Sequence, residues 1–170
     1  MGEGMIEVKV TGLGFDKTTR TPVVLLKELD GERVLPIWIG PAEAEAIARA
    51  LEGIKPDRPL THDLMKSIID GLKSKVTKVV ITELKDNTFF AKIHLENPNF
   101  DGKGKSLTHI DARPSDSIAL ALRVDVPIFV AEEIFASSGT SMEIDEETKA
   151  EALKKYLENL KPEDFGKYKI

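Results

Sequence analysis

Apolar residues follow two periods along this chain, and these periods predict a succession of strands and helices. Residues 5–11, with the sequence MIEVKVT, place an apolar side chain at every second position, as in a strand with one buried face. Apolar runs between turn residues predict further strands at 21–29, 33–40, 76–84, 88–96 and 106–112, and a buried strand that runs into a helix start at 126–135. Asp30-Gly31 and Asp86-Asn87 separate paired runs, which predicts two hairpins, with a positive φ expected at Asp30-Gly31.

Helical spacing predicts four helices, at 41–53, 62–74, 114–125 and 145–160. Proline opens the first and the third, at a position where its missing N–H leaves no helical hydrogen bond unmade. Thr61 is expected to cap the second helix. The apolar positions predict the inward faces, which are Ala44, Ile47, Ala48 and Leu51 in the first helix, Leu64, Ile68 and Leu72 in the second, and Ala152, Leu153, Tyr156, Leu157 and Leu160 in the last.

Strands and helices that mix without strict alternation indicate an α+β fold, with helices packed on a mixed, largely antiparallel sheet. At 170 residues the chain suits a single domain, predicted at 1–136, followed by a C-terminal amphipathic helix and tail at 137–170. The sequence contains no apolar run of the roughly 18 residues that a membrane span needs, and its start lacks the features of a signal peptide. We therefore expect no membrane partner and a location in the cytoplasm.

Charge and composition narrow the functional classes. The net charge of −5 and the scattered basic residues argue modestly against a dedicated nucleic-acid-binding protein, which usually carries a basic stripe. They leave room for an enzyme that contacts a few phosphates. The absence of cysteine excludes disulfides, thiolate metal sites and cysteine nucleophiles. The sequence also lacks the hydrolase elbow, the P-loop and the dinucleotide-binding fingerprint, so those three classes have no support.

Two predicted strand-to-helix junctions resemble each other, WIGPAEAEAIARAL at 38–51 and DARPSDSIALAL at 111–122. In each, an acid follows the proline by two residues, Glu43 in the first and Asp116 in the second. A structural interpretation is sufficient for both acids. A carboxylate in the first turn stabilises the positive end of a helix by roughly 0.3–1 kcal/mol. In that interpretation Ser115 and Ser117 hydrogen-bond free backbone amides, and the basic residue before Pro114 pairs with the acid that ends the strand.

A functional interpretation starts from the same geometry. Helix N-termini at the end of a sheet attract phosphate, and hard oxygen ligands suit a divalent cation such as Mg²⁺ or Mn²⁺. A cation held there activates water and steadies the leaving oxygen of a phosphodiester. The candidate metal ligands and catalytic carboxylates are Glu43, Asp111 and Asp116. A guanidinium grips phosphate bidentately, and the residues assigned to substrate binding are Arg113, Ser115 and Ser117.

The three histidines, His62, His94 and His109, show no spacing typical of a metal site, and a surface or satisfied histidine is the default interpretation for each. His62 is the best candidate for a general base, because Asp63 stands beside it at a helix start and could orient it. Trp38 is the single tryptophan and stands between two isoleucines. We predict that it packs in the core or at an interface.

The chain resembles the bifunctional nuclease domain family. The resemblance spans residues 5–135 approximately and rests on four blocks in order: LPIWIGPAEAEAIARALEG, RPLTHDL, VVITELKDNTFFAKI and DARPSDSIALALRVDVPIFVAEE. It implies an α+β fold, self-association, and activity on both DNA and RNA. The family's polar blocks match here at Gly40, Pro41, Glu43, His62, Asp63, Asp111, Arg113, Pro114, Ser115, Asp116 and Ser117.

Two functional hypotheses follow. The first is a metal-assisted nuclease that cuts DNA or RNA without marked sequence preference, with His62 as proton acceptor. The second is a non-catalytic binding or regulatory module that holds a small anion or a protein partner at the same junctions. A scaffold role for the polar clusters is a third possibility. The small residues of the helices and the WIG segment also predict a homodimer.

Overall fold

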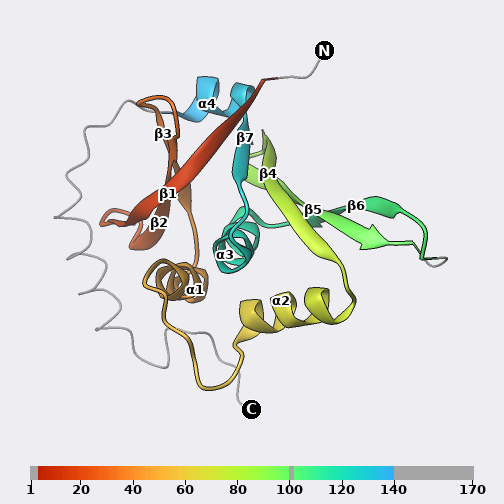
Figure 1. The fold of residues 1–170 in the computed structure, drawn as a ribbon. Coiled ribbons are helices and arrows are strands. Elements are labelled where there is room, and N and C mark those ends of the chain that lie inside the picture. The colour runs from red at the N-terminus through yellow and green to blue at the C-terminus, as the bar shows by residue number, and fades with distance from the viewer. Residues whose placement is uncertain (1–3, 100–101, 140–170) are drawn as a thin grey trace.

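The computed structural model describes residues 4–99 and 102–139. The predicted C-terminal helix at 145–160 therefore lies outside the described residues. The strands are β1 (Met5–Asp16), β2 (Thr21–Glu28), β3 (Val34–Trp38), β4 (Lys75–Lys85), β5 (Thr88–Pro98), β6 (Lys105–Ala112) and β7 (Ile128–Ala131). The helices are α1 (Pro41–Leu51), α2 (Thr61–Gly71), α3 (Pro114–Val124) and α4 (Glu132–Ser138) (Figure 1).

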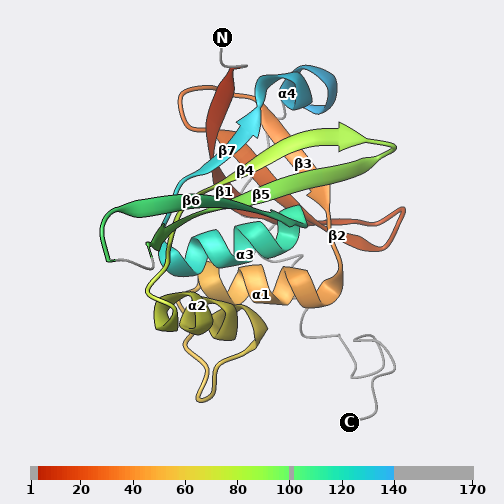
Figure 2. The same cartoon turned by 90° about the vertical axis from the view of Figure 1, so that its right-hand side faces the viewer.

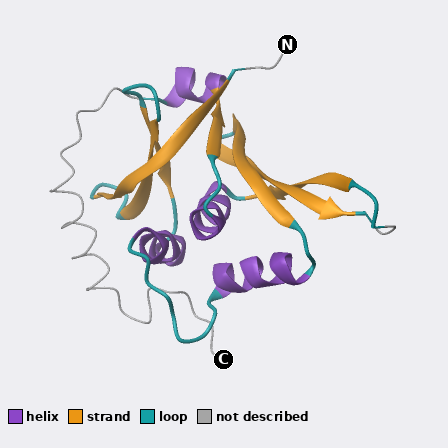
Figure 3. Ribbon diagram, in the orientation of Figure 1, coloured by secondary structure: helices purple, strands orange, loops and turns teal. Residues whose placement is uncertain are grey.

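The sheet combines antiparallel hairpins with one parallel contact. In the described part of the chain, seven strands pair in the order β3-β2-β1-β7-β4-β5-β6. Figure 3 shows the strands in orange and the helices in purple. Strands β4 and β7 run parallel, and every other neighbouring pair is antiparallel. The predicted α+β class with a mixed, largely antiparallel sheet is confirmed. No helix within the described ranges has the length and apolar character that crossing a membrane requires.

Helix α3 lies at the centre of the helical layer. Figure 2 shows α1, α2 and α3 on one side of the sheet, and Figure 1 shows the sheet bending around α3. This helix contacts β4 and β5 as well as α1 and α2, and Ile118, Ala119, Leu120 and Ala121 are all buried. A helix that is apolar on nearly every side needs such an enclosed position. Its first turn is thereby fixed between the sheet and the other two helices.

The alanine-rich faces of α1 and α3 are used within the chain. Ala44 and Ala48 are buried on α1, which packs directly against α3. Short side chains let two helix backbones approach closely. These faces are consequently unavailable for a dimer contact, and the predicted self-association has no support from them. It stays a prediction, and sedimentation giving only an 18.8 kDa species would disprove it.

The orientation of α2 differs from the prediction. Leu64, Ile68 and Leu72, expected to face inward, are each more than half exposed. His62 is buried on this helix instead, and Met65 and Ile69 pack against the main core. Leu51 at the end of α1 was predicted to be buried, but it is exposed. Thr61 was predicted to cap α2, but it is the first helical residue of that helix.

The two predicted hairpins differ in their turns. Asp86 and Asn87 both adopt positive φ, at 50° and 58°, as a two-residue turn between antiparallel strands requires. The connection at Asp30-Gly31 is longer and Gly31 does not adopt positive φ, so the tight turn expected there does not form. Strands β2 and β3 still pair in antiparallel register as predicted.

Candidate functional site

Two helix starts meet at one edge of the helical layer. Helix α1 begins with Pro41 after an extended Gly40, and α3 begins with Pro114 after an extended Arg113. Each proline stands in the first turn, where its fixed φ suits the helix and its missing N–H is not needed. The contact between α1 and α3 brings both first turns together. The sequence similarity of the two junctions therefore has a counterpart in space.

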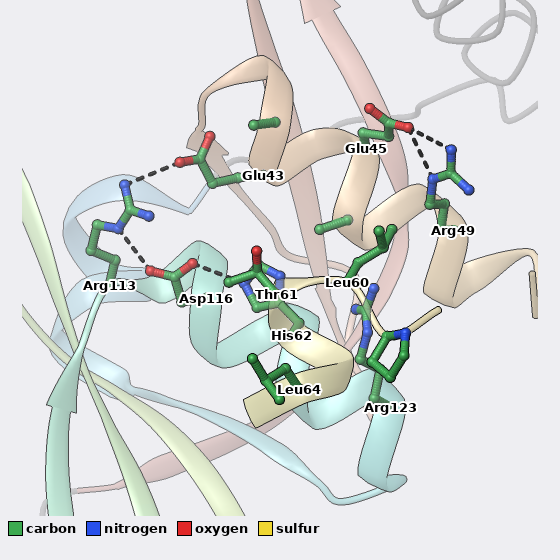
Figure 4. A pocket seen from close by; sticks show the side chains of 13 residues that line it. Glu43, Glu45, Arg49, Leu60, Thr61, His62, Leu64, Arg113, Asp116 and Arg123 are labelled. Carbon is green, nitrogen blue, oxygen red and sulfur yellow. Dashed lines mark hydrogen bonds and ion pairs between the residues drawn. The ribbon is translucent and has the colours of Figure 1, made fainter. Parts of the chain in front are cut away.

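Arg113 joins the two helix starts. Its Nε donates to Asp116 Oδ2 at 2.8 Å, and its Nη1 lies 3.1 Å from Glu43 Oε1 (Figure 4). The carboxylates of Asp116 and Glu43 raise the pKa of Arg113, first through the hydrogen bond to Asp116, so the guanidinium stays cationic. The arginine side chain is nevertheless 66% exposed. It can contact a ligand while it holds both helix starts.

His62 reaches the same carboxylate from α2. Its Nε2 lies 2.9 Å from Asp116 Oδ1, so Asp116 receives Arg113 on one oxygen and His62 on the other (Figure 4). Burial alone raises the pKa of Asp116, but the hydrogen bonds from Arg113 and His62 outweigh it and hold the pKa below its ordinary 3.8. Asp116 is therefore an ionised acceptor that fixes the His62 ring.

Asp63 has a different role from the one predicted. It does not orient His62. Its Oδ1 accepts from Arg123 Nε at 2.8 Å, and its Oδ2 accepts from the Leu60 amide at 3.0 Å. Burial raises the pKa of Asp63, and the bonds from Arg123 and Leu60 more than offset this and lower it. Asp63 thus caps α2 and ties it to α3, since Arg123 also donates to the Ala119 carbonyl oxygen at 2.8 Å.

The two serines of the predicted binding set lie in different places. Ser117 is fully buried, and its hydroxyl donates to the carbonyl oxygen of Arg113 at 3.0 Å. That bond closes the first turn of α3 and leaves Ser117 away from any ligand. Ser115 is 7% exposed, and its hydroxyl makes no hydrogen bond to a described residue. Only Ser115 of the two is placed to contact a bound molecule.

The three carboxylates of the predicted metal site do not come together among the described residues. Glu43 and Asp116 share Arg113, whereas Asp111 is exposed on β6 opposite Lys92 of β5 and lies outside the pocket described below. Nowhere in 4–99 and 102–139 do three or more histidine or acidic side chains cluster in a way that would hold a metal ion. A cation at Glu43 and Asp116 would have to displace the guanidinium that neutralises both. The donor set therefore does not fit a resident cation.

A surface pocket of about 750 Å³, which we call the first pocket, lies over these residues. Its charged lining balances three arginines against three carboxylates, although the whole chain carries −5. Figure 4 shows the side chains converging from α1, the start of α2, and α3. The lining residues are Ala42, Glu43, Glu45, Ala46, Arg49, Pro59, Leu60, Thr61, His62, Leu64, Arg113, Asp116 and Arg123.

Sequence reasoning missed two arginines of this pocket. Arg49 pairs with Glu45 at 2.8 Å across one helical turn, but no local pattern indicates that this pair lies beside a cavity. Arg123 pairs with Asp63, which is 60 residues away in the chain. A contact at that separation depends on how α2 and α3 pack, and no local pattern records it.

Comparison with known proteins identifies the family. A family model described as "Bifunctional nuclease domain" matches residues 24–143, and this range includes both helix starts and the first pocket. An uncharacterized protein of Mycobacterium tuberculosis is 42% identical over 170 residues, covering 95% of this chain and 98% of its own length. The chain belongs to the bifunctional nuclease domain family, as its sequence blocks predicted.

Plant proteins with that name are more distant. Bifunctional nuclease 1 of Arabidopsis thaliana is 28% identical over 119 residues, which cover 69% of this chain and 36% of the plant protein. Bifunctional nuclease 2 of Arabidopsis thaliana is 28% identical over 117 residues, with 68% and 35% covered. The matched region is thus about a third of each plant protein and most of this chain.

Proposed function

We propose that this protein is a nuclease that hydrolyses phosphodiester bonds of DNA or RNA without marked sequence preference. Membership of the bifunctional nuclease domain family and the names of the plant relatives support this class of activity. The observation that carries the proposal is the shared carboxylate of Asp116, which holds a histidine and an exposed arginine side by side in one pocket. Nucleic acid is the proposed partner, and the cytoplasm the proposed location.

Arg113 is the proposed phosphate-binding group. Its guanidinium is permanently charged, exposed and held in a fixed orientation by two carboxylates. A planar guanidinium offers paired N–H donors to a phosphoryl group and neutralises the charge that grows on its oxygens during displacement. Glu43 and Asp116 position this group and leave its outer edge to the substrate.

His62 is the proposed general base. When Nε2–H donates to the Asp116 carboxylate, Nδ1 carries the free electron pair. A water molecule gives its proton to Nδ1 as its oxygen attacks phosphorus, and the bond from phosphorus to the leaving oxygen breaks. Asp116 stabilises the resulting imidazolium, as a carboxylate partner does in other histidine-dependent hydrolases. The leaving oxygen takes up a proton from solvent, and the His62 imidazolium releases its proton to solvent, which returns the site to its starting charge.

Replacement of His62 tests this function. We expect His62→Ala to slow cleavage of labelled single-stranded DNA and RNA about 10²- to 10⁴-fold, the contribution typical of a general base. His109→Ala is the matched control, because His109 is exposed on β6, contacts His94 with ring centroids 4.0 Å apart, and lies outside the first pocket. Equal rates for the two folded variants would refute the role of His62.

Metal assistance stays a prediction, and the same assay decides it. Cleavage that stops in EDTA and returns with Mg²⁺ or Mn²⁺ would support a cation at this site despite the arrangement of Glu43 and Asp116 around Arg113. Cleavage that continues in EDTA would refute it. The assay uses the full chain, with activity followed through a sizing column together with the protein.

The alternative is a non-catalytic module that binds an anion or a partner protein. One observation favours it: the arginines that line the first pocket all pair with carboxylates, so the pocket has no strong excess of positive charge. Binding of an oligonucleotide without any turnover, at high protein concentration and with or without added cation, would support this reading. Turnover that His62→Ala removes would exclude it.

A further inference from the structure

A second pocket adjoins the first. It has a volume of about 450 Å³ and shares the Glu43–Arg113 pair with the first pocket, so this ion pair lies between the two cavities. Elements far apart in the sequence form its wall: the end of β3, the β4–β5 turn and the start of α3. Its lining residues are Thr21, Ile37, Trp38, Ile39, Gly40, Glu43, Asn87, Thr88, Phe89, Arg113, Pro114 and Ser115.

An exposed tryptophan lines this second pocket. Trp38 is 51% exposed, so the core alternative predicted for it is wrong, while the interface alternative stays a prediction. Alternation along the strand buries Ile37 and Ile39 and turns Trp38 to the opposite face. Its indole Nε1–H donates to Asp16 Oδ2 at 2.9 Å, which fixes the edge of the ring and leaves a face open. The half-buried Phe89 lines the same cavity. A large aromatic surface is thus held in a set orientation without being covered.

Ser115 adds an unused polar group. It is more than nine-tenths buried, lines the second pocket and makes no hydrogen bond to a described residue. No side-chain nitrogen or oxygen in the described residues is both shielded from solvent and without a partner, so the Ser115 hydroxyl keeps some contact with solvent in a residue that lines the second pocket. Ser117, two positions further along the chain, differs because its hydroxyl donates a hydrogen bond to the Arg113 carbonyl oxygen.

We infer that the second pocket is a subsite for an unpaired nucleobase, so that the substrates of this protein are single-stranded nucleic acids. The base stacks on Trp38, the Ser115 hydroxyl hydrogen-bonds to its polar edge, and the adjoining phosphate contacts Arg113. This inference rests on the proposed nuclease function for the phosphate at Arg113. Its own basis is the second pocket, where an aromatic face, a free hydroxyl and a neighbouring cation match a planar base joined to a phosphate.

Base pairing decides which strands fit. A base inside a duplex stacks on its neighbours and hides its polar edge, so it would have to leave the helix to enter the second pocket. Stacking on an aromatic ring accepts any base, because each has a π-face. Among the described residues that line this pocket, only the paired Glu43 and Arg113 are charged, which suits a neutral ring and disfavours a second phosphate at this position. Preference for unpaired strands without preference for sequence follows.

The single tryptophan makes the subsite directly observable. We expect a hexamer of deoxythymidylate to quench Trp38 fluorescence of the full-length protein, whereas a hairpin duplex and a hexamer of abasic sugar-phosphates leave it unchanged. By fluorescence anisotropy, Trp38→Ala should bind a labelled hexamer roughly 5- to 100-fold more weakly, the range that loss of one base stack produces. Trp38→Tyr should retain most of the affinity. Leu107→Ala, which removes an exposed apolar side chain outside both pockets, is the matched control.

Two results would overturn the inference: equal quenching by the hexamer and its abasic counterpart, or unchanged affinity in a correctly folded Trp38→Ala. The wild-type quenching needs no variant, so it remains decisive if Trp38→Ala fails to fold. Failure of the nuclease function gives a different result, because base-dependent binding would then occur without cleavage. Conversely, cleavage of base-containing and abasic strands at equal rates by wild type and Trp38→Ala would leave the nuclease function intact and remove the subsite.

Discussion

In the part of the chain that the structure describes, two arginines each bridge a pair of carboxylates, Arg33 with Glu28 and Glu132, and Arg113 with Glu43 and Asp116. Both have a raised pKa, for which the first cause is a hydrogen bond to one of the carboxylates. Each also joins segments distant in the sequence: Arg33 ties the β2–β3 connection to α4, and Arg113 ties α3 to α1. By pairing alone, the two clusters would be classed together.

Their surroundings separate them. The Arg33 guanidinium lies 5.1 Å from the centre of the Phe135 ring, and the residue lines neither pocket. Arg113 is more exposed, lies on the wall of both pockets, and shares Asp116 with a histidine. We therefore propose a functional role for the Arg113 cluster alone, because a cavity and a further reactive side chain accompany it. The raised pKa of the arginine, taken alone, does not distinguish the Arg33 cluster from the Arg113 cluster.

The largest expected difference between the clusters is in activity after removal of the arginine. Arg113→Ala should lower kcat/KM for oligonucleotide cleavage about 10²- to 10³-fold, as loss of a group that neutralises transition-state charge does. Arg113→Lys should recover only part of this, because an ammonium group lacks the planar paired donors. Steady-state kinetics on a labelled single-stranded substrate measure both variants.

Arg33→Ala is the matched control, since it also leaves two carboxylates without their shared partner. We expect unchanged kinetics and a lower melting temperature, because α4 loses its tie to the β2–β3 connection. Cleavage that falls equally in Arg33→Ala and Arg113→Ala would mean that both act through stability, and the distinction drawn between the clusters would fail.

The pH dependence of stability offers a second comparison of the two clusters, through Asp116 in one and Glu28 in the other. The pKa of Asp116 lies below 3.8 and that of Glu28 below 4.5, because the arginine hydrogen bonds favour the charged forms over the effect of burial. A lowered pKa contributes stability that is present above the unfolded value and lost as pH falls through the folded value. Asp116→Asn and Glu28→Gln should each therefore be less stable than wild type at pH 7, with the difference shrinking below about pH 4.

Activity then distinguishes the two variants. Asp116→Asn should reduce cleavage about 10²-fold, because His62 loses the carboxylate that fixes its ring and supports its charge. Glu28→Gln should cleave at the wild-type rate. Denaturant unfolding at pH 7 and pH 3 measures the change in stability of the two variants. Cleavage at pH 7 measures the change in their activity. Cleavage by Glu28→Gln that is as slow as cleavage by Asp116→Asn would show that the site depends on global stability.

Much of this arrangement was predictable, and the failures have definite physical reasons. Local periodicity predicted the succession of strands and helices, and the repeated proline–acid junction pointed to Glu43 and Asp116. For α2, periodicity found the apolar stripe correctly but assigned it to the wrong side. The stripe of Leu64, Ile68 and Leu72 is exposed because the packing of α2 on α3 is set by Arg123 and His62, whose partners are far away in the sequence.

Strand geometry explains two further errors. The isoleucine neighbours of Trp38 led to the prediction that it packs in the core or at an interface, and the core alternative is wrong because in a strand such neighbours point to the opposite face. Asp111 stands two residues before Arg113, but it is still within β6, exposed opposite Lys92, whereas Arg113 has left the strand. Asp111 was predicted to belong to the site because it is close to Arg113 in the sequence. The strand ends at Ala112, after Asp111, so Asp111 stays on β6 and does not line the first pocket.

The smallest expected difference concerns two glycines that lie against the paired acids. A methyl group at Gly40 would meet only the end of the flexible Glu43 side chain, whereas at Gly31 it would meet both the carboxylate and the Cβ of the buried Glu28. Gly40→Ala should therefore keep its melting temperature and cleave about two- to fivefold more slowly, since the exposed ion pair it disturbs is worth roughly 0.2–1 kcal/mol. Gly31→Ala should melt earlier and cleave normally. The reverse pattern would show that Glu43 supports the fold and that Arg113 is positioned by Asp116 alone.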